Sequence, residues 1–428
     1  MITNSDISFD TNTNKSICIY PFIHSYVGSM YERKLCCVSD DLDELKKTSL
    51  SEFWNSEKMK QTRKDMIEGK PIKECSRCYE YEKVGVSSLR QEACRDVIFS
   101  KIMSNVNEDG SMSTGPVYYD HRTIHCNFQC LSCGTYYSST HIQLQKEMWN
   151  KDTDFTVDHE YERGSANDII ESLRKKECTS IYWAGGEPFM SHVHWAVVEE
   201  MYNLGQNPEY RDYIQQIRVH YNTNLSKSVW KNKKIVDLIE FYQPSIQASI
   251  DGTHETFEYC RDGGVWSEVS NNWKEFHSKL NKNRQMGIAS VLSAPVIFDI
   301  DRWFEFFEPY DPALYNHKYV WSLSNIPDRT INFLDIRLYP KDVCENAINH
   351  AIERFDKSKL RGKEKSIQIL KSYLVEREEN KETFENEKSL KQIKERCVYR
   401  DKFLKTKRPF IEVLNRINQE AAKWYLAL

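Results

Sequence analysis

Long apolar runs are missing from this 428-residue sequence. A membrane-spanning helix needs about 20 consecutive apolar residues, and the chain offers no such stretch. The first fifteen residues are polar and lack the apolar segment of a secretory signal peptide. The sequence therefore predicts neither a membrane span nor export, and the expected location is the cytoplasm.

A large excess of charge of one sign is also missing. The 59 Lys and Arg residues nearly balance the 63 Asp and Glu residues, which gives a net charge of −4. Proteins that bind nucleic acid mainly through phosphate contacts carry a positive excess. No nucleic-acid partner is therefore expected.

Cysteine, by contrast, is plentiful, with 13 residues in the chain. Because no export signal is present, these cysteines are better interpreted as cytosolic thiols and metal ligands than as disulfides. The length predicts two or three structural units, and 40% hydrophobic residues suffice for a sizeable core.

Three of the cysteines lie within eight residues, in the segment Cys126-Asn-Phe-Gln-Cys130-Leu-Ser-Cys133. A short loop of this kind can direct three thiolates at one iron–sulfur cluster and leave one iron open to another ligand. A zinc site with three cysteines and one histidine is the alternative, with His121 or His125 as the fourth ligand. Three unrelated thiols are the simplest alternative.

A second motif follows about fifty residues later. Ile181 to Pro188 reads Ile-Tyr-Trp-Ala-Gly-Gly-Glu-Pro, which predicts a buried strand that ends in a glycine turn with a carboxylate. Strands alternating with helices predict parallel βαβ units, and the reactive groups of barrels collect where such strands end. The expected strands are 117–124, 180–184, 217–222, 245–250, 288–296 and 319–323, and helices are expected at 194–203, 234–241 and 267–281.

Together, the two motifs resemble those of radical S-adenosylmethionine (SAM) enzymes, which carry CxxxCxxC after the first barrel strand and GGEP after the second. The resemblance covers about residues 115 to 330. It implies an α/β fold with a partial (β/α)6 barrel. Many members have an aromatic residue before the third cysteine, where this chain has Ser132; Cys126 to Gly134 is similar to the subset that reads CNxxCxxCG.

The resemblance also implies roles for individual residues. Cys126, Cys130 and Cys133 would hold a [4Fe–4S] cluster, and the cofactor SAM would lie at the ends of the strands. Asn and Asp are also ordinary turn residues, and Arg261 also fits a surface ion pair. The implied SAM-binding residues are Gly185, Gly186, Glu187, Pro188, Asn222, Asn224, Ser249, Asp251 and Arg261.

The region before the barrel holds a second group of cysteines. A strand from Cys18 to Tyr26, a turn at Gly28 and a strand ending at Cys36 and Cys37 predict a hairpin. A helix from Ser51 to Met66, with Ser51 as its cap, precedes Cys75 and Cys78.

This arrangement is similar to the twitch and SPASM auxiliary-cluster modules of radical SAM enzymes, although those modules usually follow the barrel. The implied ligands of a second cluster, expected as [4Fe–4S], are Cys18, Cys36, Cys75 and Cys78. Cys37 competes with Cys36, but adjacent strand residues point to opposite faces, so one of the two is expected to face the cluster. A zinc ribbon on the same thiols is the alternative. Cys94 is expected to be a buried thiol.

These patterns predict four regions. They are a loose leader (1–16), an auxiliary-cluster module of small α+β type (17–112), the partial barrel (113–335) and a helical C-terminal extension (336–428). The extension is expected to contain helices at 347–355, 365–376 and 390–396 and to present a solvated charged face. Covering the barrel and contacting a partner are both open roles for it.

The expected function is that of an enzyme that cleaves SAM reductively and abstracts a hydrogen atom from a substrate. The resemblance favours a peptide or protein substrate, although no leader-peptide-binding domain is apparent. Dehydrogenation of a small alcohol or amino-sugar is the first alternative, and a non-catalytic zinc scaffold is the second. An electron donor such as flavodoxin or ferredoxin is the expected partner.

Overall fold

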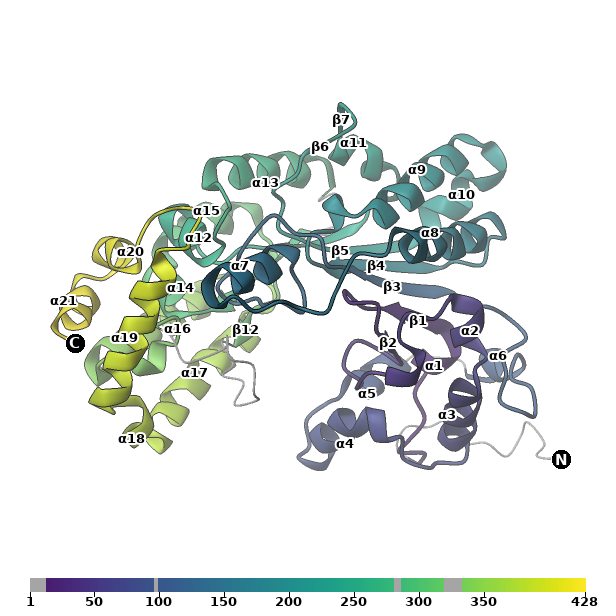
Figure 1. Cartoon of the computed structure of the whole chain (residues 1–428), viewed down its shortest axis with the longest axis horizontal. Coiled ribbons are helices and arrows are strands. Elements are labelled where there is room, and N and C mark those ends of the chain that lie inside the picture. The colour runs from purple at the N-terminus through teal and green to yellow at the C-terminus, as the bar shows by residue number, and fades with distance from the viewer. Residues whose placement is uncertain (1–12, 96–98, 281–285, 319–332) are drawn as a thin grey trace. The chain divides into compact units, whose positions relative to one another are not determined.

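The computed structural model describes residues 13–95, 99–280, 286–318 and 333–428. The chain divides into two compact units. Unit 1 comprises Met1–Thr123 and Phe155–Val219, and unit 2 comprises Ile124–Asp154 and His220–Leu428. Each unit combines mainly parallel strands with helices, which confirms the predicted α/β class (Figure 1). Within the described ranges, neither set of strands closes into a barrel.

The strands of unit 1 follow the order β2 (Arg33–Lys34), β1 (His24–Val27), β3 (Tyr118–Thr123) and β4 (Ser180–Gly185). β3 and β4 are parallel and in register along their whole length. β1 and β2 form the predicted antiparallel hairpin, but β2 ends at Lys34, so the expectation of a strand ending at Cys36 and Cys37 is wrong and both cysteines lie in the following turn. β1 also pairs in parallel with β3, so the hairpin extends the same sheet.

The strands of unit 2 follow the order β5 (Arg218–Thr223), β8 (Ser245–Ser249), β9 (Met286–Ala289) and β11 (Ala313–Leu314), and all three pairings are parallel. β5 begins in unit 1 and ends in unit 2. A short parallel pair joins β10 (Val291–Leu292) to β12 (His317–Lys318), and β6 (Val229–Trp230) forms a hairpin with β7 (Lys233–Lys234).

Helices follow the strands in both units. In unit 1, Asp158 caps α8 by accepting hydrogen bonds from two backbone amides, and the apolar side of α8 is buried. The larger helices that follow the strands are α8 (His159–Arg174), α9 (His192–Gln206) and α10 (Pro208–Gln216) in unit 1, and α7 (Ser139–Trp149), α11 (Ile235–Ile239), α12 (His254–Cys260), α13 (Trp266–Leu280) and α15 (Ile300–Phe307) in unit 2.

Most predicted strands and helices are present with small changes of boundary. The expected strand at 288–296 is wrong in its second half, where α14 (Ala294–Phe298) forms instead. Pro295 stands in the first turn of α14, a position that suits its fixed backbone angle and missing amide hydrogen. The strand expected at 319–323 lies outside the described residues.

The predicted strand from Cys18 to Tyr26 is also wrong in its first half. A short helix, α1 (Tyr20–Ile23), occupies this part, and β1 starts only at His24. Pro21 again lies in the first helical turn and favours the helical backbone angle.

The helix predicted from Ser51 to Met66 is in fact two helices. α2 (Leu50–Trp54) is capped by Ser49, not Ser51, through a capping box with Glu52. α3 (Glu57–Ile67) has its own cap at Ser56. The break falls at Asn55, whose side chain bonds to both the amide and the carbonyl of Met112 and so competes with helix continuation.

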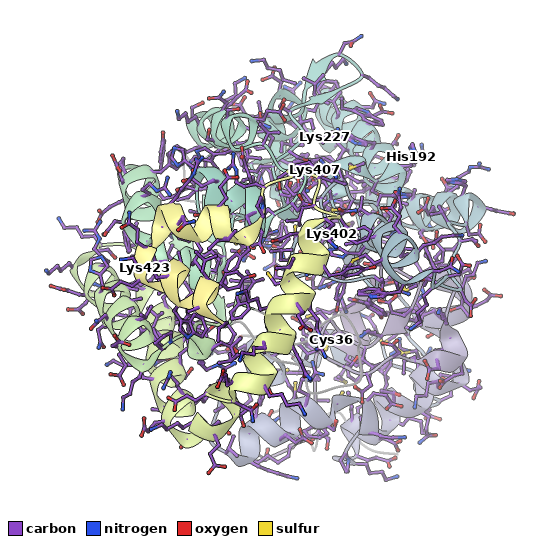
Figure 2. All side chains as sticks on the ribbon, turned by 60° about the vertical axis from the view of Figure 1, so that its left-hand side comes forward. Cys36, His192, Lys227, Lys402, Lys407 and Lys423 are labelled. Carbon is purple, nitrogen blue, oxygen red and sulfur yellow. The ribbon has the colours of Figure 1, made fainter. Side chains whose placement is uncertain are left out.

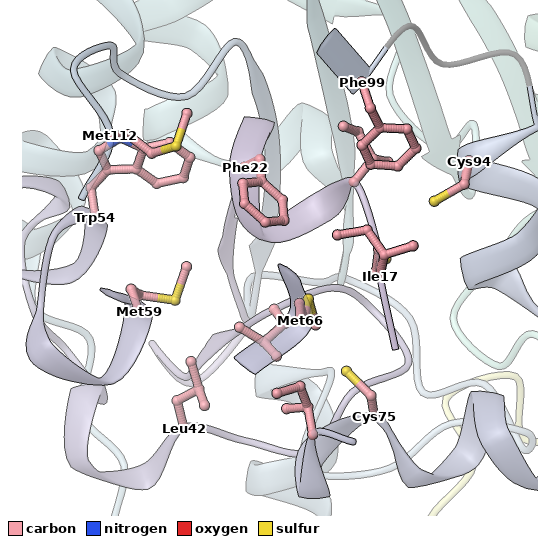
Figure 3. Packing of buried hydrophobic residues seen from close by; sticks show 14 of the residues in the cluster. Ile17, Phe22, Leu42, Trp54, Met59, Met66, Cys75, Cys94, Phe99 and Met112 are labelled. Carbon is pink, nitrogen blue, oxygen red and sulfur yellow. The ribbon is translucent and has the colours of Figure 1, made fainter. Parts of the chain in front are cut away.

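A hydrophobic cluster holds the N-terminal part of unit 1 together (Figure 3). It includes Phe22 of α1, Trp54 of α2 and Met59 and Met66 of α3, all buried. The cysteines Cys18, Cys75 and Cys94 belong to the same cluster. Further short helices complete this region: α4 (Ser76–Lys83), α5 (Leu89–Cys94) and α6 (Phe99–Met103).

The C-terminal region is helical, as predicted. The helices are α16 (Lys341–Lys357), α17 (Lys363–Glu379), α18 (Lys381–Phe384), α19 (Glu387–Asp401), α20 (Phe410–Ile417) and α21 (Gln419–Ala427). Single-turn 3-10 helices occur at Asp43–Leu45, Lys73–Cys75, Pro188–Met190, Glu240–Tyr242, Glu308–Tyr310 and Ile336–Leu338. Among the described helices, none is long and apolar enough to cross a membrane.

The buried Arg63 links α3 to its neighbours and provides a test of this packing. Its guanidinium donates to the carbonyl oxygens of Pro21 and Trp54, both at 2.8 Å, and stacks 4.5 Å from the Trp54 ring. Arg63→Met leaves these acceptors unsatisfied, although the loss of a buried charge offsets part of the effect. We expect a loss of about 2 kcal/mol in the free energy of unfolding.

Denaturant titration measures this loss. Gln61→Ala, an exposed change on the same helix, serves as the control and should stay within about 0.5 kcal/mol of the parent. Equal stability of the two variants would contradict the assigned role of Arg63.

Candidate functional site

The cysteine loop starts in unit 2, directly after β3. Its middle is held by backbone hydrogen bonds to the end of α12: Gln129 donates to the Asp262 carbonyl at 2.7 Å, and Leu131 donates to the Cys260 carbonyl at 2.9 Å. Cys130 is buried, whereas Cys126 and Cys133 are partly exposed. The loop is thus a fixed segment with thiols at three of its positions.

The side chain of Asp262 connects this loop to the C-terminal region. Its two carboxylate oxygens accept hydrogen bonds from the backbone amides of Lys405 and Thr406, each at 2.9 Å. The Lys405 ammonium also donates to the Asn127 carbonyl at 3.0 Å. Gly263, at φ +94°, makes room here, because a Cβ would lie 3.1 Å from the Asn127 oxygen. The C-terminal extension therefore contacts the cysteine loop.

Arg261 lies beside the buried thiol. Its Nη1 is 3.8 Å from the Cys130 sulfur, and its Nε is 2.8 Å from Oδ2 of the buried Asp251. Burial raises the pKa of Cys130 to about 12, and the guanidinium opposes this rise. Arg261 interacts with Cys133 as well. Since a cation favours the thiolate, this environment suits cysteines that act as ligands.

Asp251 in turn joins two strands. Its Oδ1 accepts from the amide of Val291 in β10 at 2.7 Å, while Oδ2 holds Arg261. Sequence reasoning left a surface ion pair open for Arg261, but the structure places the pair next to the cysteine loop, with Asp251 2% exposed.

The end of β5 contacts the same loop. The Asn224 amide donates to Oδ1 of Asn127 at 3.1 Å, and Ser226 exchanges hydrogen bonds with the same side chain. Asn222 and Ser249 lie near the ends of β5 and β8 and are partly exposed. The predicted site residues of unit 2 therefore follow neighbouring parallel strands.

The Gly-Gly-Glu turn lies in unit 1, at the end of β4. Gly185 has φ +101°, and a Cβ there would lie 2.3 Å from the Thr123 carbonyl oxygen, so only glycine fits. Gly186 donates to that oxygen at 2.6 Å. Glu187 is fully buried and its carboxylate accepts from the Phe189 amide at 3.0 Å, with Pro188 in the first position of the next turn.

The histidines of the zinc alternative have separate surroundings. His121 is buried in β3, and its ring lies 5.8 Å from the ring of Trp183. Burial lowers its pKa to about 4. His125 is partly exposed, just before Cys126.

The auxiliary cysteines gather in unit 1. Cys36 interacts electrostatically with Cys18, Cys75 and Cys78, and all four thiols are buried. Cys94 is buried, as predicted, and hydrogen-bonds to Cys18, which raises the Cys18 pKa. No pattern in the sequence indicated this pair.

Cys37 has a different environment. Its side chain is exposed and interacts with Asp120 and Arg122, an ion pair on one face of β3 with N···O distances of 3.1 and 3.3 Å. The Arg122 guanidinium also stacks on the ring of Tyr26, 5.2 Å away. The two neighbouring cysteines thus have different partners, but they lie in the turn after β2, so strand alternation is not the cause.

The donor chemistry of both groups suits iron–sulfur clusters, because each offers several cysteine thiols, the usual ligands of such clusters. Among the residues that the structure describes, no group of three or more His, Cys, Asp or Glu side chains is arranged to hold a metal ion.

Comparison with known proteins gives remote structural likenesses. No protein-family model and no curated protein matches the chain. Native anSMEcpe with bound AdoMet matches with a TM-score of 0.38 and 14% identity, over 57% of this chain and 63% of that one. Streptococcus suis SuiB bound to S-adenosylmethionine gives 0.37 and 13%, over 72% and 64%.

Streptococcus suis SuiB bound to its precursor peptide SuiA gives a TM-score of 0.36 and 12% identity, over 67% of this chain and 61% of that one. The chain therefore covers less than two thirds of each of these structures. Likeness at this level assigns no residue a role, so function has to be argued from the side chains of this chain.

Substitution of Gly185 tests the turn. Gly185→Ala forces a side chain into a left-handed backbone position and against the Thr123 oxygen. We expect a loss of about 2 kcal/mol or more in the free energy of unfolding, measured by denaturant titration. Gly134→Ala is the matched control, since a Cβ there meets nothing within 4 Å. A Gly185→Ala variant as stable as the control would show that the turn has another conformation.

Proposed function

We propose that this chain is a radical SAM enzyme. One observation carries the proposal: both motifs start from a single pair of strand ends. Thr123, the last residue of β3, accepts a hydrogen bond from Gly186 of the Gly-Gly-Glu turn, and Cys126 follows Thr123 by three residues. A zinc scaffold has no need for a buried carboxylate in a glycine turn beside that strand end.

In this proposal, Cys126, Cys130 and Cys133 would hold a [4Fe–4S] cluster. When bound, the cluster and SAM supply a 5′-deoxyadenosyl radical that abstracts a hydrogen atom from the substrate. The Arg261 guanidinium favours the thiolate form of Cys130, and Asp251 keeps the guanidinium in place.

The turn after β4 would bind the amino acid part of SAM. The Glu187 carboxylate would accept a hydrogen bond from the ammonium group, which is a charge-assisted contact. Gly185 and Gly186 let the backbone approach without a Cβ, and Pro188 fixes the start of the following turn. Asn222, Asn224 and Ser249 would contribute polar groups at the neighbouring strand ends.

The thiols of unit 1 would hold a second cluster. We assign Cys18, Cys36, Cys75 and Cys78 to it, because Cys36 interacts with the other three while Cys37 lies with Asp120 and Arg122. Four thiolates leave no open iron in a four-iron cluster, so this centre would accept an electron from the substrate radical rather than bind the substrate.

The proposed substrate is a peptide or protein, and the proposed electron donor is a flavodoxin or ferredoxin. We propose three functional regions, as the sequence suggested: the auxiliary module (17–112), the barrel (113–335) and the helical extension (336–428). The module with the second cluster thus precedes the barrel in sequence, and the extension that contacts the cysteine loop follows it. Contact of Lys405 and Thr406 with Asp262 supports a role of the tail in holding the cysteine loop.

Loss of one loop thiol tests the proposal. We expect Cys130→Ala to abolish dithionite-dependent formation of 5′-deoxyadenosine and to lower the iron content by one four-iron cluster. The readouts are chromatography of the nucleoside and iron analysis of anaerobically reconstituted protein. Cys178→Ala is the control, because that buried thiol contacts the Ser180 carbonyl and has no proposed ligand role. Unchanged nucleoside release in Cys130→Ala would refute the assignment.

The two neighbouring cysteines provide a second test. Cys36→Ala should remove the auxiliary cluster, whereas Cys37→Ala should keep it, because Cys36 is buried and interacts with Cys18, Cys75 and Cys78, whereas Cys37 is exposed beside Asp120 and Arg122. Iron content and electron paramagnetic resonance of the reduced proteins measure the difference. The reverse result would mean that Cys37 and not Cys36 faces the cluster, and zinc in place of iron in both variants would support the scaffold.

A further inference from the structure

Unit 2 contains a cavity of about 500 Å³ next to the cysteine loop. Its walls come from α7, α19 and α20 and are mostly apolar, including Leu144, Met148, Ile393 and Phe410. Leu131 and Cys133 of the loop form another part of the lining. Ligand-binding cavities of proteins commonly measure about 300–1,000 Å³ and combine apolar walls with a few polar groups. The cavity has the size and lining of a binding site.

The mouth of the cavity is aromatic. Trp149 and Tyr399 line it and remain 48% and 42% exposed. The Tyr399 hydroxyl donates to the Met148 carbonyl at 3.0 Å, which ties α19 to the end of α7. Apolar surface therefore continues from the interior to the outside, which suits a ligand that is larger than the cavity.

The lining combines neutral polar groups, such as Gln145 and Tyr259, with Lys and Arg side chains. Lys151, Arg396 and Arg400 line the cavity, and no Asp or Glu does. In the described part of the chain, none of these three side chains forms an ion pair. Lys402 and Lys407 add two exposed cations to the segment that follows Arg400 (Figure 2). Unpaired cations beside an apolar cavity are complementary to a ligand with apolar and anionic parts.

We propose that this cavity binds an acidic peptide segment that carries a large apolar side chain, and that it recognises the substrate of the enzyme outside the reacting centre. The apolar side chain enters between α7 and α19, and acidic residues on either side of it meet Lys151, Arg396 and Arg400. This inference rests on the proposed function for its choice of a peptide substrate.

The distribution of charge favours a peptide over a small acid. Lys151 and Arg396 are exposed, whereas much of the lining is apolar; Lys151 follows the end of α7, and Arg396 and Arg400 belong to α19. A single carboxylate neutralises one of them, while several acidic residues spaced along a peptide reach all three. An acidic electron-transfer protein would also meet the cations, but it would bind on the exposed surface and would not need the cavity.

The test is binding of fluorescein-labelled Asp-Glu-Leu-Phe-Glu-Asp to the full chain, measured by fluorescence anisotropy without SAM. Two matched probes replace the apolar pair (Asp-Glu-Ser-Gly-Glu-Asp) or the charges (Lys-Lys-Leu-Phe-Lys-Lys). We expect the first peptide to bind at least about tenfold more tightly than either control probe.

Variants locate the site. Arg396→Glu and Met148→Trp should each weaken binding of the acidic apolar peptide about tenfold, the first by charge reversal and the second by filling the cavity. Lys388→Glu, an exposed charge reversal on the same helix that does not line the cavity, should change it less than twofold. Thermal unfolding midpoints check that each variant is folded. If Met148→Trp does not fold, the inference is tested by the comparison of the three peptides and by Arg396→Glu.

Three results would overturn the inference. The first is that the peptide without apolar residues binds as tightly as the acidic apolar peptide, and that Arg396→Glu weakens binding while Met148→Trp does not. This result would assign the surface to an acidic protein such as the electron donor. The second is that 3-phenylpropionate displaces the labelled peptide at the same concentration as the unlabelled peptide does. This result would assign the cavity to a small acid. Absence of binding refutes the site itself. Because no SAM is present, these results are independent of 5′-deoxyadenosine formation, whose loss would instead refute the proposed function.

Discussion

Asp262 holds the cysteine loop through its backbone carbonyl and connects it to the C-terminal region through its side chain. The loop has no regular secondary structure, so its shape comes from external hydrogen bonds, and the Asp262 carbonyl accepts one of them from Gln129. The carboxylate, 1% exposed, accepts two more from Lys405 and Thr406. A buried carboxylate that meets two amides is strongly constrained, because each lost bond leaves a charge unsatisfied. The thiols therefore depend on a residue more than a hundred positions away.

The strand ends impose a second constraint, this time in unit 1. β3 and β4 are in register up to Thr123 and Gly185, and the chain then turns so sharply that a Cβ has no room. The buried Glu187 follows at once, and its carboxylate caps the next turn. A position fixed in this way loses little conformational entropy on binding a ligand, which is the advantage of preorganisation.

The sequence predicted those features of the fold that depend on residues close together in the chain. Strands with apolar alternation and the helices between them were predicted within a few residues, and both motifs lie at strand ends. The prediction was wrong where one segment carries signals for both a strand and a helix, and it was absent where a residue contacts a partner far away in the sequence. Pro21 and Pro295 start helices inside segments that read as strands, and Asn55 breaks a helix by bonding to Met112. The contact of Asp262 with Lys405, like that of Cys18 with Cys94, leaves no trace in the pattern of the sequence.

The pairing of β1 with β3 explains how a hairpin that precedes β3 and β4 in sequence can belong to their sheet. Four residue pairs, from His24 opposite Tyr118 to Val27 opposite His121, attach the hairpin to the edge of β3. Cys36 and Cys37 follow the second strand of this hairpin by two and three residues. Both cysteines therefore lie beyond the paired residues, in a turn where the Ser39 hydroxyl accepts from the Cys36 amide and the Ser39 amide donates to the Cys36 carbonyl, each at 3.3 Å. The choice between the two cysteines thus depends on the conformation of this turn, whose start is fixed by the pairing of β1 with β2, and not on strand alternation.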